Sequence, residues 1–328
     1  MFRLLEEAWQ IIKKYKFLWI FGIFTSYLLP IDPSDFFSIL NTKGLSESFL
    51  SIKSILELSI GKLNLYNLAN ISSEILINQP RLYSVIYPLI AVLIFIILAL
   101  ILISIISEIS LIFAVNRIRK NEDINFKLAL RSSFKYFGRI FLFDLFIMFC
   151  FLIATIPVLF FILNNKIGEL LIYLIITFPL YFAFFFYIAI FYMLCIRMII
   201  IDDMSLVNGI LTTDKIIRSN LKQGFKFFII YLILDIGLSF LLGLVLAVLL
   251  IPAIGFNLIT SLENQQSILF AVIKLFAPLI MLISLLLAII AKGAGSAFIS
   301  SWITLVYLDY FRSEGEKVEK LNSQEVPA

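Results

Sequence analysis

Five ionisable residues interrupt long apolar runs of this chain, and any chemistry inside those runs would depend on them. They are Glu108, Asp144, Arg197, Asp235 and Lys292. Ionisable groups inside membrane helices are costly, so they tend to face a cavity or one another. Counted from the ends of their runs, all five lie in the cytoplasmic half of the predicted spans. Three interpretations stay open: ion pairs that lock helices together, a polar pocket for a headgroup or small solute, and a proton or cation relay through Glu108 and Asp235.

Basic residues recur at helical spacing before two of the apolar runs, at Lys127, Arg131, Lys135 and Arg139 and again at Arg218, Lys222 and Lys226. Residues four apart share one side of a helix. They are either the positive anchors that any multi-pass membrane protein needs or candidate contacts for anionic lipid headgroups. Each Lys or Arg adds about 1 kcal/mol of attraction near a charged membrane surface.

Several kinds of chemistry are excluded by residue type. The chain has no His, so a Ser-His or Cys-His couple is impossible. Its two Cys, Cys150 and Cys195, fall inside apolar runs, where buried Cys behaves as a small hydrophobe. No P-loop, dinucleotide glycine motif or HExxH occurs. We therefore expect no cofactor, no metal site and no nucleic-acid binding, and we assign no catalytic residue.

The composition is that of a membrane protein. Hydrophobic residues make up 62% of the 328 positions, whereas soluble domains are about half apolar. A helix needs about 20 apolar residues to cross the hydrocarbon, and an open sheet would leave backbone groups unpaired in lipid. The sequence predicts an all-α integral membrane fold with six spans, near 17–29, 87–117, 140–163, 170–200, 227–252 and 268–308.

The spans fall into three units, 1–120, 121–203 and 204–312, within one transmembrane domain. Each unit is predicted to be an in-plane amphipathic helix followed by a membrane hairpin. In the third unit Ser205 is a candidate N-cap, with Ile210, Ile217 and Leu221 facing lipid. Residues 31–84 form an outer loop, and 313–328 a disordered tail.

The glycines after Lys292 admit two interpretations. Gly293 and Gly295 interrupt a long apolar run, which predicts a kink or break in the sixth span. The same small residues also suit close helix packing. Lys292 is expected at the depth of Glu108, with which it would pair.

Charge distribution predicts the orientation. The segments predicted to lie inside hold 19 of the 26 Lys and Arg residues. Cytoplasmic segments of membrane proteins carry such an excess. Both termini are therefore expected in the cytoplasm, and the tail with them.

Three short stretches carry a resemblance to a family. They are Phe17-Leu18-Trp19-Ile20-Phe21-Gly22 after Ala8-Trp9, the segment 197–203 followed by Ser205, and the ending 304–309. In these the chain is similar to prokaryotic multi-pass proteins that resemble the membrane domain ahead of some glycerophosphodiester phosphodiesterases. The hydrolase domain and its acidic metal site have no counterpart here. The resemblance therefore implies a membrane module rather than phosphodiesterase activity.

The functional expectation follows from these points. We expect a non-enzymatic plasma-membrane protein that organises anionic lipid or a partner protein, or that forms a homo-oligomer. A small-solute transporter or permease is the alternative, since repeated hairpins and acids at depth suggest a central site. An intramembrane lipid enzyme using paired acids is a third possibility.

Overall fold

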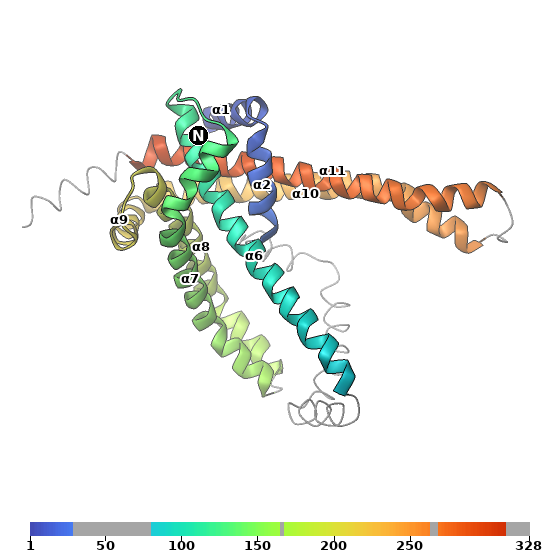
Figure 1. Cartoon of the computed structure of the whole chain (residues 1–328). Coiled ribbons are helices and arrows are strands. Elements are labelled where there is room, and N and C mark those ends of the chain that lie inside the picture. The colour runs from blue at the N-terminus through green and yellow to red at the C-terminus, as the bar shows by residue number, and fades with distance from the viewer. Residues whose placement is uncertain (29–79, 165–166, 263–267, 313–328) are drawn as a thin grey trace, which may run out of the picture. The chain divides into compact units, whose positions relative to one another are not determined.

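The computed structural model describes residues 1–28, 80–164, 167–262 and 268–312, and these ranges contain helices and no strand. The α-helices, labelled in Figure 1, are α1 Phe2–Lys14, α2 Phe17–Leu28, α6 Pro80–Arg119, α7 Phe126–Leu163, α8 Ile167–Ile201, α9 Leu206–Ser219, α10 Leu221–Leu262 and α11 Ile268–Val306. A short π-helix, η1 Tyr307–Phe311, follows α11. The predicted all-α class is confirmed for this part of the chain. The expected tail 313–328 and most of the expected loop 31–84 lie outside the described residues.

Five helices are long and apolar enough to cross a membrane, over Ile90–Arg119, Phe126–Val158, Ile172–Ile201, Leu221–Leu244 and Leu286–Phe311. Many of their large apolar side chains are not covered by protein: Phe95 is 70% exposed, Ile175 74% and Phe240 71%. Soluble monomers rarely leave large apolar patches uncovered, whereas in a bilayer these side chains meet hydrocarbon. The chain is a multi-pass membrane protein.

Helix α2 corresponds to the first predicted span and differs from the other five in length. It has 12 residues, which cover about 18 Å at the α-helical rise. The hydrocarbon core is about 30 Å thick, so the described length of α2 does not cross it.

The predicted in-plane helices are only partly separate elements. Helix α1 precedes α2, and α9 precedes α10, each as a distinct helix. In the second unit the basic stripe is instead the first part of α7, which runs without interruption from Phe126 to Leu163. No Pro lies between Arg131 and Ile140 to end the helix. The only glycine there, Gly138, stays helical. The separate in-plane helix expected in this unit is therefore not formed.

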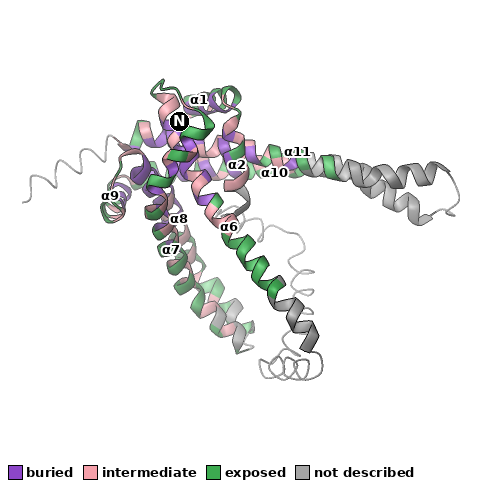
Figure 2. Ribbon diagram, in the orientation of Figure 1, coloured by how far each residue is buried: buried purple, intermediate pink, exposed green. Residues whose placement is uncertain are grey.

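Helix α6 crosses the boundary between two compact units of the chain. Residues Pro30–Leu102 form one unit, while Met1–Leu29 and Ile103–Ala328 form the other. The interactions described below, those of α6 included, belong to the second unit. Its buried residues concentrate in α1, in the C-terminal halves of α6 and α8, and around the end of α11, as Figure 2 shows in purple.

The contact between α2 and α11 depends on two glycines. A Cβ atom at Gly22 would lie 2.0 Å from the carbonyl oxygen of Gly293, and a Cβ at Gly293 would lie 2.3 Å from Cγ1 of Ile23. Small residues continue the contact, and Thr25 and Ser296 share a hydrogen bond of 3.0 Å between their Oγ atoms. Helix α11 is unbroken through this region. The predicted helix break is therefore wrong, and the glycines serve the close packing that the sequence also allowed.

Substitution of Gly22 by Ala should destabilise the protein, because the new methyl group meets the backbone of α11. Overpacking of this kind costs about 1–3 kcal/mol, which thermal unfolding in detergent should report as a lower Tm. Gly138→Ala is the matched control, since a Cβ there has nothing within 4 Å. Helix propensity predicts that this control is neutral or stabilising by up to about 1 kcal/mol. Equal Tm values for the two variants would contradict the close contact.

Candidate functional site

A buried cluster lies where α6, α7 and α8 meet. It consists of Glu108 from α6, Asp144 from α7, and Tyr192 and Arg197 from α8. The Tyr192 hydroxyl donates a hydrogen bond of 3.2 Å to Oε2 of Glu108. Asp144 interacts electrostatically with Glu108 and lies beside Tyr192. The phenol therefore stands next to both carboxyl groups, and Phe143 stacks on its ring at 5.7 Å between centroids.

Arg197 is the cation of the buried cluster, and its side chain is held mainly by backbone groups. The residue is 2% exposed. Its Nη1 donates to the Met193 carbonyl oxygen at 2.6 Å, and its Nη2 contacts the carbonyl oxygen and Oγ of Ser300 on α11, each at 3.4 Å. Glu108 attracts the guanidinium electrostatically without forming an ion pair within 4 Å. A buried charge needs such compensation, because it has left water.

The buried cluster holds more acid than base. Among the described residues, neither carboxylate oxygen of Asp144 has a hydrogen-bond partner, although both are inaccessible to solvent. Two ionised carboxylates beside one guanidinium would leave a net negative charge in a low-dielectric region, which is unfavourable. The arrangement can therefore accept a proton or a small cation.

The structure brings together three of the five residues predicted at depth, Glu108, Asp144 and Arg197. The expected pair of Glu108 with Lys292 is not formed: Glu108 faces Tyr192 and Arg197, while Lys292 is an exposed residue of α11. Asp235 is 8% exposed on α10. Contacts of Phe227 with Trp302 and of Leu238 with the Gly295 position show that α10 and α11 run antiparallel. Asp235 and Lys292 thus lie on two helices that pack side by side.

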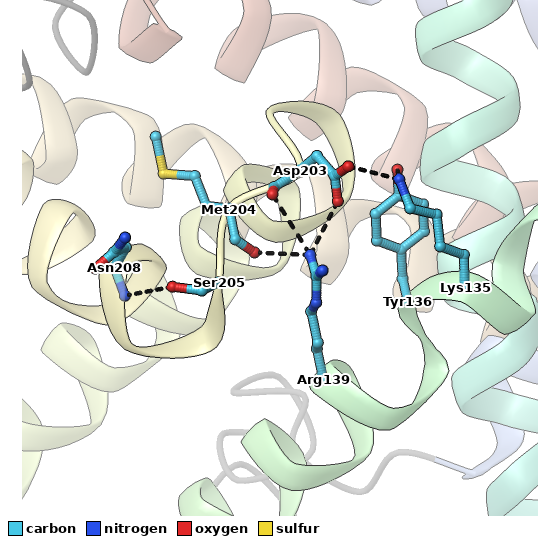
Figure 3. Close-up of polar contacts among 7 residues, drawn as sticks. All are labelled: Lys135, Tyr136, Arg139, Asp203, Met204, Ser205 and Asn208. Atoms are coloured by element: carbon cyan, nitrogen blue, oxygen red, sulfur yellow. Dashed lines mark hydrogen bonds and ion pairs between the residues drawn. The ribbon is translucent and has the colours of Figure 1, made fainter.

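A second polar region joins the start of α7 to the link between α8 and α9 (Figure 3). The carboxylate of Asp203 accepts from Nζ of Lys135 at 2.5 Å and from Nη1 of Arg139 at 2.9 Å. Arg139 also donates to the Met204 carbonyl oxygen at 3.1 Å. Asp203 has a φ of +52°, a left-handed conformation in which Asp is enriched among non-glycine residues. Ser205 then caps α9 by accepting from the Asn208 amide at 3.4 Å.

Charge stabilises this link. The hydrogen bond from Lys135, assisted by Arg139, holds the pKa of the Asp203 carboxyl below its ordinary value. A carboxyl group with a lowered pKa stabilises the folded state above the pKa of the unfolded chain, about 3.9 for Asp. That contribution is lost as the pH falls through the lower, folded-state value.

Other ion pairs gather at the same helix ends. Arg119 at the end of α6 binds Asp309 at 2.6 Å and Glu7 of α1 at 3.6 Å. Arg312 binds Asp202, which also accepts a hydrogen bond from Tyr307. We call this region the charged end: α6, α8 and α11 end there, and α7 and α10 begin there.

The seven predicted headgroup contacts divide into two sets. Lys135 and Arg139 bind Asp203, and Arg218 binds Asp214 at 2.9 Å. The remaining four side chains are exposed and have no ion-pair or hydrogen-bond partner among the described residues: Lys127, Arg131, Lys222 and Lys226.

Sequence reasoning missed Tyr192, Asp203 and Ser300. A tyrosine inside an aromatic-rich span carries no distinguishing pattern, and Ser300 is one of many hydroxyl groups. Asp202 and Asp203 did offer a signal, since two adjacent acids follow a span directly and lie between two basic stripes. No protein-family model, curated protein or solved structure matches this chain.

Loss of Arg197 should be strongly destabilising, because Glu108 would stay buried without its cation. Removing one partner of a buried charge pair typically costs about 3–5 kcal/mol. We expect Arg197→Met to lower the Tm sharply and Glu108→Gln/Arg197→Met to recover part of the loss. Arg117→Met is the matched control: its partner Glu122 is 43% exposed, and an exposed pair contributes at most about 1 kcal/mol. Strict additivity of the two single variants would show that Glu108 and Arg197 do not interact.

Proposed function

We propose that this chain is a non-enzymatic, multi-pass plasma-membrane protein that gathers anionic lipid at its charged end. The observation that carries this proposal is the set of four exposed basic residues without protein partners, Lys127 and Arg131 on α7 and Lys222 and Lys226 on α10. Lipid phosphate is the anion that a membrane protein meets at this level.

The position of these cations on their helices favours an anion further. Helix N-termini carry a partial positive charge and normally attract acidic side chains. The first turns of α7 and α10 contain no acid and place Lys127 and Lys222 there instead. The helix dipole and the basic side chains thus attract the same kind of ligand, an anion.

The membrane arrangement belongs to the same proposal. The charged end would face the cytoplasm, in agreement with the excess of basic residues there. With α2 as a sixth span, both termini would lie inside. The grouping of contacts among helix ends supports this arrangement, since Arg119, Asp203 and Asp309 all lie in the charged end.

The resemblance to the membrane domain of some glycerophosphodiester phosphodiesterases fits a module that arranges lipid or a partner without hydrolysing it. A partner protein or a second copy of the chain would then bind beside the recruited lipid. Of the three predicted in-plane helices, two are separate helices on this proposal, α1 and α9. The third is the basic first part of α7.

Lipid binding can be separated from folding by two matched pairs of substitutions on α7. Lys127→Gln/Arg131→Gln removes two cations without protein partners, while Lys135→Gln/Arg139→Gln removes the two that bind Asp203. At about 1 kcal/mol per cation, the first variant should weaken binding of phosphatidylglycerol by about 2 kcal/mol, or roughly 30-fold. Native mass spectrometry of the full chain in detergent with titrated lipid measures this change.

The second variant should chiefly lower the Tm, because the α8–α9 link loses its cations. Phosphatidylcholine is the control lipid, whose binding should not respond to either variant. Unchanged phosphatidylglycerol affinity of Lys127→Gln/Arg131→Gln would refute the proposal.

Small-solute transport is the second candidate, and the buried cluster favours it. Acids at depth beside a tyrosine and an arginine are typical of solute or ion pathways. On this alternative, Asp144→Asn should abolish a pH-driven or sodium-driven flux into liposomes while changing the free energy of unfolding by no more than about 1 kcal/mol. Leu142→Asn, also on α7 but exposed on the apolar surface, is the control. Failure to find flux for ions and small solutes in the wild-type protein would leave lipid binding as the function.

A further inference from the structure

Helix α9 presents three different sides, and only one of them is covered by protein. Gly209, Thr213, Ile216 and Ile217 are buried. Helix α8 covers two of them: the Gly209 position faces Ile199 and Cys195, and the Thr213 hydroxyl contacts the Met198 sulfur at 3.1 Å. The prediction that Ile217 faces lipid is therefore wrong, because that side of α9 packs inside the protein.

The exposed surface of α9 is divided by polarity. Val207 and Leu211 lie one turn apart, 64% and 56% exposed. The apolar strip ends at Asp214, which follows on the same side, binds Arg218 at 2.9 Å and accepts a hydrogen bond from Tyr187 of α8. Asn208 and Thr212 lie one turn apart on the neighbouring side, with Ser219 beyond them. A helix that is covered on one side would show a uniformly polar remainder if water surrounded it. Here an apolar strip and a polar strip run in parallel.

The chain holds α9 at the level of the membrane surface. Four residues, 202–205, connect it to the end of the α8 span, and Asn220 alone connects it to α10. Ion pairs of Asp203 with α7 fix the first of these links. With spans attached at both ends by such short links, α9 cannot leave the interface, so its apolar strip must meet lipid, water or another protein at that depth.

We propose that α9 is an interfacial helix whose Val207–Leu211 strip inserts into the inner leaflet while its Asn208–Thr212 strip faces the cytoplasm. The proposal rests on the orientation given above for the proposed function. The partner is the acyl and headgroup boundary of the membrane itself. Charge complementarity supports this choice: Lys222 and Lys226, which have no ion-pair partner among the described residues, follow in the first turns of α10. Basic residues beside an apolar strip are the pattern by which helices lie in anionic interfaces.

Spin labelling tests this placement residue by residue. In a background of Cys150→Ala/Cys195→Ala, single variants Val207→Cys, Leu211→Cys, Asn208→Cys and Thr212→Cys are labelled and reconstituted into nanodiscs. Oxygen concentrates in lipid and a nickel chelate stays in water. We expect an oxygen-to-nickel accessibility ratio several-fold higher for the labels at positions 207 and 211 than for their neighbours at 208 and 212. Circular dichroism and Tm confirm that each variant is folded.

The lipid composition of the nanodiscs distinguishes insertion of α9 from selection of anionic lipid by α7. A high ratio at 207 and 211 in both phosphatidylcholine and phosphatidylglycerol nanodiscs supports insertion even where the Lys127 and Arg131 experiment fails. Equal ratios at 207 and 208 would overturn it, and low accessibility of positions 207 and 211 to both reagents would instead show a protein partner or a second copy. In inverted vesicles, external ascorbate should reduce the label at position 208, whereas in right-side-out vesicles it should not. The reverse result would refute the placement of α9 at the inner leaflet.

Discussion

The cost of removing an ion from water is the constraint on which this structure depends. Charged groups are tolerated at the ends of spans, where water and headgroups reach them, and deeper only with compensation. At the charged end Arg119 binds Asp309, and Asp203 binds two cations of α7. The deeper Arg197 is almost fully buried and is surrounded by a backbone carbonyl, a serine and the acids of the buried cluster. The buried guanidinium is thus compensated by neutral groups and nearby acids rather than by water.

Two modes of helix packing operate side by side in this fold. Between α2 and α11, backbones approach because Gly22 and Gly293 have no side chains. Around α10 and the end of α11, large rings fill the space instead, as where Phe227 stacks on Trp302 at 5.5 Å between centroids. Lipid offers no hydrophobic drive for helix association, so close backbone contact and specific polar contacts matter more than in water. The hydrogen bond between Thr25 and Ser296 adds such a contact to the glycine pair.

The sequence predicted the class of fold well, because apolar runs of span length have few alternative explanations. It predicted charges at depth but not their partners. Glu108 was expected beside Lys292 from equal depth alone, yet depth gives no information on which helices are neighbours, and Tyr192 and Arg197 of α8 lie there instead. The stripe from Lys127 to Arg139 was correctly read as helical. Its separation from the following span could not be judged, because amphipathic pattern does not show whether a helix continues.

The glycine contact also bears on movement. With no room between their backbones at Gly22 and Gly293, α2 and α11 can neither slide nor rotate past each other without first coming apart. Helix α1 packs on α11 as well, where Trp9 meets Phe298 edge to face. These three helices would travel as one rigid piece in any rearrangement of the protein. Helix α8 is joined to the same piece, because Arg197 contacts Ser300 of α11 and Tyr307 donates a hydrogen bond to Asp202 at the end of α8.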